Sequence, residues 1–274
     1  MTDLNQTLPL CRVADDGALH MRQTFVGLAL RCPAAAGCYL THGPRPPGLA
    51  AVVGQGAHRA FEQGCRDLMS QRAEGWDKTP YLSGLIATAE DHLDRCLRSD
   101  VALDPDQPAD RQIDKARDDL VATVRRFVSE VAPTLAPERV EWRVAIRVGQ
   151  DVVSTALDLV QVGGVVEDFK TGRRTDDRSA HESRQLTAQA LAYRLTEGRM
   201  PAGLGLRAVN PERSGSHWTT RTEADLRAYL DAVRQVAAMV RAGLFPPCGE
   251  GAWWCSAKWC GWHPGAGGPC RFGR

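Results

Sequence analysis

Residues 140–170 alternate between apolar and polar side chains, and this block constrains the fold more than any other part of the chain. It consists of three runs, VEWRVAIRV (140–148), DVVSTALDLVQV (151–162) and VVEDFK (165–170). A period of two residues is typical of β-strands, and the short gaps between the runs predict sequential antiparallel pairing. The chain must therefore build a sheet around this block.

Helical periodicity dominates most of the remaining sequence. We expect helices over about 53–69, 81–98, 113–131, 181–197 and 222–243, and one more strand over 204–210. Thr222 is a candidate N-cap of the last helix, and Gly243 ends it. Strands interspersed with helices of this length predict an α/β fold in which helices flank a mixed central sheet.

The strand VVEDFK carries two acids and a lysine within four residues. Because side chains alternate along a strand, Asp168 and Lys170 should project from one face, and Glu167 and Phe169 from the other. Asp158 on the preceding strand is the candidate second carboxylate. A two-residue Gly163-Gly164 turn would place Asp158 opposite Phe169, whereas a three-residue loop over 162–164 places it opposite Asp168.

Two neighbouring carboxylates offer hard oxygen ligands to Mg²⁺ or Mn²⁺. The ammonium group of Lys170 could then orient a water molecule or stabilise charge on a phosphate. The alternative for the same residues is a surface Asp–Lys ladder that contributes little stability. An odd-length loop or a bulge in the hairpin is therefore the structural feature that the catalytic interpretation predicts.

The series Asp158, Asp168-Phe169-Lys170, Thr171-Gly172 resembles the PD-(D/E)XK nuclease superfamily, specifically its RecB-like branch. Gly54-x3-His58-x3-Glu62 resembles the branch's N-terminal helix, in which a histidine joins the metal ligands. SRQLTAQALAY (183–193) resembles its glutamine-containing helix. The resemblance favours Gln185, although Gln189 with Tyr193 is the alternative match.

This resemblance implies a restriction-endonuclease-like α/β fold and a set of site residues. His58, Asp158 and Asp168 would ligate Mg²⁺ or Mn²⁺, while Lys170 and Gln185 would complete the catalytic set. The implied organisation is an N-terminal segment (1–20), a nuclease domain (21–244) with a helical insertion at about 65–135, and a cysteine-rich tail (245–274) that closes on Cys32.

Nine cysteines are present, and the N-terminus lacks the pattern of a signal peptide, so we expect a cytoplasmic protein with reduced thiols. By the same resemblance, a 4Fe–4S cluster would be held by one upstream and three downstream cysteines, namely Cys32, Cys255, Cys260 and Cys270. Cys248 and Cys38 are possible substitutes. Zinc, bound by four cysteines or with His263, is the alternative, and buried thiols suit Cys65 and Cys96. Four tryptophans of the tail are expected to pack around the cluster: Trp253, Trp254, Trp259 and Trp262.

The net charge is only +1, so binding to a polyanion must come from local basic clusters. Candidate phosphate contacts are Arg143, Arg147, Arg173, Arg174 and Arg184, and a solvated surface is the alternative for each. No Gly-x4-Gly-Lys-[Ser/Thr] loop occurs, so we expect no NTP-driven motor in this chain. No run of about 18 apolar residues occurs either, so no membrane span is expected.

The function that these residues and the resemblance imply is metal-dependent hydrolysis of DNA by an exonuclease acting on single strands or ends. Recombination, repair, phage DNA processing and CRISPR adaptation are the processes that such an enzyme would serve. A helicase or recombination protein is the expected partner, and the chain could also form an oligomer. The alternative is a non-enzymatic nucleic-acid-binding or assembly module that retains the fold and the cluster.

Overall fold

The computed structural model describes residues 9–73, 81–249 and 251–272, so the predicted N-terminal segment (1–20) is described only from residue 9 on. The chain divides into two compact units that do not follow its order. Unit 1 comprises residues 1–45, 144–155 and 221–274, and unit 2 comprises 46–143 and 156–220. Strands β3 (Pro137–Val148) and β4 (Asp151–Gln161) run from one unit into the other.

Unit 2 contains the predicted hairpin. The second half of β4 pairs antiparallel with β5 (Val165–Lys170), β5 pairs parallel with β6 (Gly203–Val209), and β6 pairs antiparallel with β7 (Ser214–Thr219). β3 also pairs with β4. The sheet is thus mixed and helices flank it, which confirms the predicted restriction-endonuclease-like fold class.

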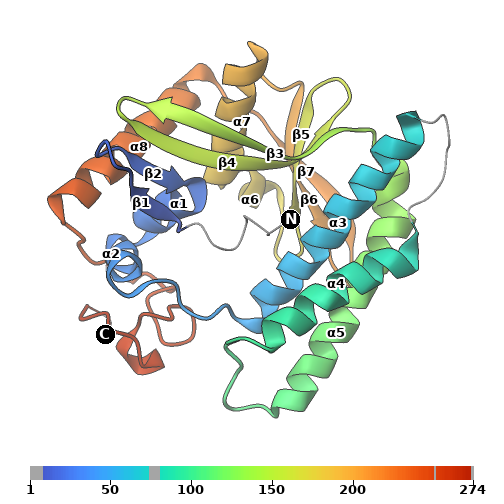
Figure 1. Ribbon diagram of the computed structural model, residues 1–274, viewed down its shortest axis with the longest axis horizontal. Coiled ribbons are helices and arrows are strands. Elements are labelled where there is room, and N and C mark those ends of the chain that lie inside the picture. Colours follow the sequence, from blue (N-terminus) through green and yellow to red (C-terminus); the bar gives the residue numbers. More distant parts are fainter. Residues whose placement is uncertain (1–8, 74–80, 250, 273–274) are drawn as a thin grey trace. The chain divides into compact units, whose positions relative to one another are not determined.

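Three long helices build the main apolar core of unit 2. They are α3 (Leu49–Ala73), α4 (Leu82–Leu97) and α5 (Ala109–Arg126), which lie side by side in Figure 1. A π-helical turn (Phe127–Val131) and a 3-10 turn (Ala132–Thr134) follow α5. Phe61 and Phe127 stack at a ring-centroid distance of 4.6 Å, and Phe169 of β5 packs on Phe61 at 5.1 Å. This cluster fixes one face of β5 against α3.

The opposite face of β5 meets α7 (Arg184–Glu197), which lies within the helix predicted over 181–197. A short helix that the sequence pattern did not predict, α6 (Asp177–Glu182), precedes it. The side chain of Asp176 accepts a hydrogen bond from the Ser179 amide, and the side chain of Ser183 accepts one from the Leu186 amide. Each is an N-cap, so the two helices begin separately.

Unit 1 contains β1 (Cys11–Val13) paired antiparallel with β2 (Leu19–Arg22), which pairs parallel with the first half of β4. Its helices are α1 (Gln23–Arg31), α2 (Pro33–His42) and α8 (Glu223–Ala242). Thr222 is the N-cap of α8 as expected and forms a capping box with Asp225, and Gly243 ends that helix in the left-handed conformation. None of the described helices is long and apolar enough to span a membrane.

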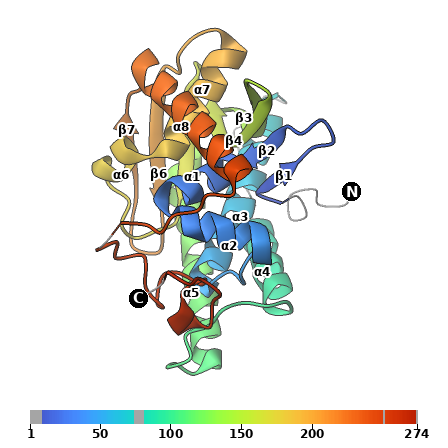
Figure 2. The ribbon, with the colours of Figure 1, turned by 90° about the vertical axis from the view of Figure 1, so that its left-hand side faces the viewer.

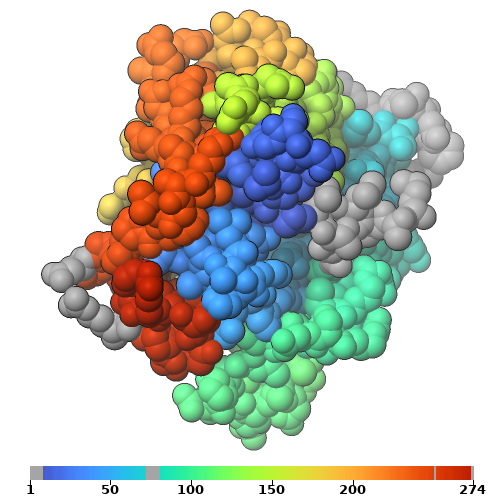
Figure 3. Space-filling model, turned by 60° about the vertical axis from the view of Figure 1, so that its left-hand side comes forward, coloured from blue at the N-terminus to red at the C-terminus, as the bar shows by residue number. Residues whose placement is uncertain are grey.

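The C-terminal tail also belongs to unit 1, and its regular structure is limited to a 3-10 turn (Pro264–Ala266). Figures 2 and 3 show the tail lying against α2. The amide of Ala34 donates to the carbonyl of Pro246 at 3.0 Å. Gly37 lies so close to the ring of Phe245 that an added Cβ would collide with it. The start of α2 is therefore joined to the start of the tail.

Candidate active site

The hairpin loop between β4 and β5 has the register that the catalytic interpretation predicts. Leu159 pairs with Glu167 and Gln161 with Val165, so the loop comprises three residues, 162–164. Both loop glycines adopt positive φ, 91° for Gly163 and 87° for Gly164, a conformation that glycine adopts without strain. One step along this register places Asp158 opposite Asp168.

The two faces of β5 separate as alternation requires. Glu167 is fully buried and forms an ion pair with Arg207 at 2.7 Å between Oε1 and Nη2. It thus lies on the same face as Phe169 and away from Lys170. Glu167 is therefore a buried residue of the core on the face of β5 that alternation predicted for it.

Asp168 is fully buried and is contacted by three polar side chains. Its Oδ1 accepts hydrogen bonds from Nε2 of Gln185 at 2.5 Å and of Gln189 at 2.9 Å, both on α7. Its Oδ2 lies 2.5 Å from Nζ of Lys170. Lys170 in turn donates to Oε1 of Gln185 at 2.9 Å. Both glutamines therefore reach the carboxylate, and Gln185 also contacts the lysine.

The protonation of Lys170 follows from these neighbours. Burial by itself would lower the pKa of its ammonium group, but Asp168 and Asp158 together hold that pKa above its ordinary value. Lys170 is therefore a cation at neutral pH. It can orient a water molecule or a phosphate oxygen, whereas it has no free lone pair with which to accept a proton.

At Asp158, in contrast to Lys170, the surroundings disfavour the charged form of the side chain. Burial, followed by the nearby Asp168 carboxylate, raises its pKa well above the usual range. Its Oδ2 accepts a hydrogen bond from the backbone amide of Phe169 at 3.0 Å and lies 3.4 Å from Nδ1 of His58. Burial lowers the pKa of His58, so the imidazole is neutral and has a lone pair available for a metal.

Glu141 on β3 is an acidic residue near the candidate site that was not predicted from the sequence. It is the non-glycine residue with positive φ in the described chain, at 49°. Val140 packs on the α3 core while Trp142 contacts Tyr193 of α7, although regular alternation would place residues 140 and 142 on one face. The irregularity at Glu141 redirects its side chain.

Burial raises the pKa of the Glu141 carboxyl to about 7, and the charges of Asp158 and Glu62 add to this shift. His58 acts in the opposite direction. Glu141 therefore lies within electrostatic range of the predicted metal ligands. Apolar residues occupy every second position of β3, so the sequence pattern contained no sign of the irregularity.

The structure does not arrange these side chains as ligands around one point. Among the described residues, no group of three or more His, Cys, Asp and Glu side chains could hold a metal ion as placed. Asp168 turns toward Lys170 and the two glutamines, while Asp158 turns toward His58 and the Phe169 amide. The donor types nevertheless suit Mg²⁺ or Mn²⁺, because carboxylate oxygens are the hard ligands that these ions prefer.

The arginines predicted to contact phosphate differ in their ion pairs and in the unit to which they belong. Arg173 is paired with Glu212 at 3.0 Å, which reduces its availability for a phosphate. The other four arginines are exposed, namely Arg143, Arg147, Arg174 and Arg184. Arg147 belongs to unit 1 and the other three to unit 2.

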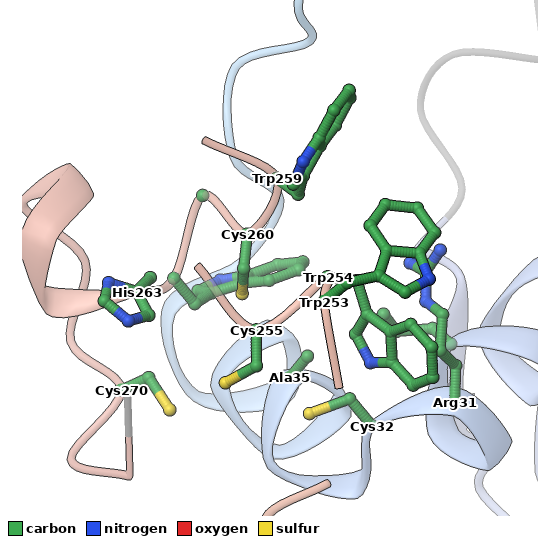
Figure 4. Close-up of a pocket in the computed structure, with 13 residues that line it drawn as sticks. Arg31, Cys32, Ala35, Trp253, Trp254, Cys255, Trp259, Cys260, His263 and Cys270 are labelled. Carbon is green, nitrogen blue, oxygen red and sulfur yellow. The ribbon is translucent and has the colours of Figure 1, made fainter. Parts of the chain in front are cut away.

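The cysteines predicted to bind a cluster gather in unit 1. Cys32, Cys255, Cys260 and Cys270 line one pocket of about 140 Å³, and Figure 4 shows their sulfur atoms turned toward the same space. Cys248 packs against the cluster that contains Cys32 and Cys270. His263 lines the same pocket, and its Nδ1 accepts a hydrogen bond from the Gly265 amide.

Cys38 also packs against the cluster that contains Cys32 and Cys270. Burial raises the pKa of the Cys38 thiol to about 11. The two cysteines assigned to apolar helix faces lie elsewhere, since Cys65 is fully buried in the α3 core and Cys96 packs against it. The upstream and downstream cysteines are thus brought together from both ends of the chain.

All four tail tryptophans line the pocket of the cysteines, but they are exposed to different degrees. Trp254 and Trp262 are partly buried, and Trp262 packs against the cysteine cluster. Trp253 and Trp259 are 68% and 60% exposed. The tail is too short to cover four indole rings, so two of them remain at the surface.

The comparison with known proteins and the geometry of the hairpin lead to the same family. A search of curated proteins finds no match. A family model of the PD-(D/E)XK nuclease superfamily matches residues 24–264, which include the hairpin, α3, α7 and most of the tail. The chain belongs to the PD-(D/E)XK nuclease superfamily.

Proposed function

We propose that the chain is a metal-dependent nuclease that cleaves DNA, acting on single strands or free ends. The observation that carries this proposal is the cluster around Asp168, in which a buried carboxylate contacts Lys170 and Gln185 and lies opposite Asp158 across the hairpin. Membership of the nuclease superfamily supports the same reaction class.

His58, Asp158 and Asp168 are the proposed ligands of Mg²⁺ or Mn²⁺. Two carboxylates in neighbouring strand positions repel each other when both are ionised, and burial together with this repulsion raises the pKa of Asp158. A divalent cation would remove that penalty and would lower the pKa of a water molecule bound to it. Glu141 is available as a further acidic group at the edge of the same set.

The side chains themselves can position the reacting groups. Gln185 and Gln189 hold Asp168 Oδ1, which fixes the orientation of the carboxylate. Lys170 is held by Asp168 and by Gln185 Oε1, so its remaining N–H donors point to a defined position. We propose that Lys170 orients the attacking water or stabilises the negative charge that develops on the scissile phosphate.

A 4Fe–4S cluster held by Cys32, Cys255, Cys260 and Cys270 is the second part of the proposal. The four thiols share one pocket, and they come from the end of α1 and from the tail. A cluster there would join both ends of the chain and stabilise unit 1. Cys38 and Cys248 pack against the group that contains Cys32 and Cys270 and are the alternative ligands. Zinc is the alternative metal.

The test is cleavage of labelled single-stranded and duplex DNA by anaerobically purified protein with Mn²⁺, with Lys170→Ala and Glu167→Asp assayed in parallel. The expected result is Mn²⁺-dependent cleavage that Lys170→Ala reduces by at least about 100-fold. Glu167→Asp is a matched control, because it changes an acid on the same strand that faces the core. Unchanged cleavage by Lys170→Ala would overturn the mechanism. No cleavage by any form would indicate a nucleic-acid-binding or assembly module instead.

A further inference from the structure

Two tryptophans that line the margin of the cysteine pocket remain largely exposed on the surface of the tail. The rings of Trp253 and Trp259 lie edge to face with centroids 5.7 Å apart, and both are more than half exposed. Figure 4 shows them at the margin of the cysteine pocket. Large aromatic side chains rarely remain exposed in pairs without a ligand, because their burial would stabilise the protein.

Positive charges surround these rings. Nζ of Lys258 lies 5.3 Å from the ring centroid of Trp259. Arg31 lines the same pocket, and the side chain of Arg45 lies against Gly261. All three cationic side chains are exposed, and none has an ion pair with a carboxylate of the described residues.

The surrounding sequence lacks negative charge to an unusual degree. The chain has 33 acidic residues, yet none lies between Asp16 and Glu62 and none follows Glu250. α1, α2 and residues 251–272 are therefore a locally basic part of a chain whose net charge is only +1. Such a surface is complementary to phosphate groups.

We infer that Trp253, Trp259, Lys258, Arg31 and Arg45, which we call the tail surface, bind single-stranded DNA. Bases would stack on the indole rings, and the cations would contact the phosphates. Single strands are the form of DNA that fits, because a duplex hides the faces of its bases within its own stack. The choice of DNA rests on the proposed nuclease function, whereas the choice of a single strand rests on the exposed rings.

The experiment is fluorescence anisotropy of a labelled oligothymidylate, longer than the roughly 4–16 nucleotides that such surfaces cover. It is done without divalent metal, so that binding is measured in the absence of cleavage, and a blunt duplex is measured alongside. Trp253→Ala and Trp259→Ala should each weaken single-strand binding by about 5-fold or more, since one stacked base contributes about 1–3 kcal/mol. Duplex binding should change by less than about 2-fold.

Four further variants test stacking, location and charge separately. Trp253→Phe and Trp259→Phe should restore most of the affinity, because phenylalanine also stacks. Trp218→Ala, at a half-exposed tryptophan of β7 in unit 2, should have no effect on the affinity. Lys258→Gln should make the salt dependence of single-strand binding weaker. The slope of the logarithm of the association constant against the logarithm of the salt concentration should fall by the amount that corresponds to about one phosphate contact.

Unchanged single-strand affinity in both alanine variants, or an equal loss of duplex affinity, would overturn the inference. Failure of the phenylalanine variants to restore binding would do the same. These outcomes are independent of the cleavage assay. A protein that binds oligothymidylate through the tail surface but cleaves nothing would refute the proposed nuclease and leave this inference standing.

Discussion

Asp158→Asn should stabilise the metal-free protein, although it removes a proposed catalytic ligand. Cross-strand neighbours have Cβ atoms roughly 5 Å apart. Two carboxylates at that distance, at an effective dielectric constant of about 20, repel each other by about 3 kcal/mol. Asparagine keeps an oxygen that can accept from the Phe169 amide, but it forfeits charge assistance and attraction to Lys170, about 1–2 kcal/mol together.

The net gain expected from Asp158→Asn is therefore about 1–2 kcal/mol in the free energy of unfolding, or a Tm increase of about 2–8 °C. The gain should depend on pH. Because the pKa of Asp158 is raised in the folded state, its contribution to stability is fully present below about pH 4, the pKa of an unfolded aspartate, and is lost as pH rises through the folded pKa. The variant should therefore match the wild type at low pH and exceed it near neutrality.

The assay is thermal unfolding in the presence of a chelator, repeated with Mn²⁺. Saturating Mn²⁺ at about 100 times its Kd should stabilise the wild type by about 2.7 kcal/mol and Asp158→Asn by much less. Glu167→Gln is the matched control, since it breaks a buried ion pair with Arg207 and should cost about 3–5 kcal/mol. If metal-free Asp158→Asn has a lower Tm than the wild type, similar to that of Glu167→Gln, the two carboxylates do not destabilise the folded protein by repulsion.

Three further predictions concern the Glu141 carboxyl, the hairpin loop and the cysteine pocket. The metal-free wild type should lose stability as pH rises through about 7, where the Glu141 carboxyl ionises, and Glu141→Gln should remove the part of this loss that is due to Glu141 in a series of Tm measurements. Gly164→Ala should destabilise the hairpin more than Gly163→Ala does. Both positions have positive φ, but only at Gly164 would the added Cβ collide with a tyrosine hydroxyl, so urea unfolding should separate them. Cys255→Ala should lower the iron content and visible absorbance of anaerobically purified protein, and Cys96→Ala should leave both unchanged; equal loss in the two variants would contradict the assigned ligands.

The hairpin could be predicted closely from the sequence because alternation and loop length leave few choices. β5 begins at Val165 and ends at Lys170 as expected, and the three-residue loop follows from the need to place Asp158 opposite Asp168. The N-cap at Thr222 was equally accessible, since N-cap chemistry depends on residues three apart.

Features that depend on tertiary contacts could not be predicted. The helix α2 lacks an amphipathic pattern, because alanines fill its buried positions. The irregularity at Glu141 lies within a strand of regular alternation. The contact of both Gln185 and Gln189 with one carboxylate depends on how α7 lies on the sheet, so the sequence left the two as alternatives. Exposure of Trp253 and Trp259 depends on how much surface the tail has available for packing.

The central claim is that a divalent cation binds between Asp158 and Asp168, next to Lys170. The most direct measurement is anomalous diffraction from crystals of the protein soaked in Mn²⁺. We expect a strong anomalous peak within about 2.0–2.3 Å of a carboxylate oxygen of each aspartate, with His58 as a further ligand. The peak should be lost in Asp168→Asn. A peak elsewhere, or none in the wild type at millimolar Mn²⁺, would contradict it.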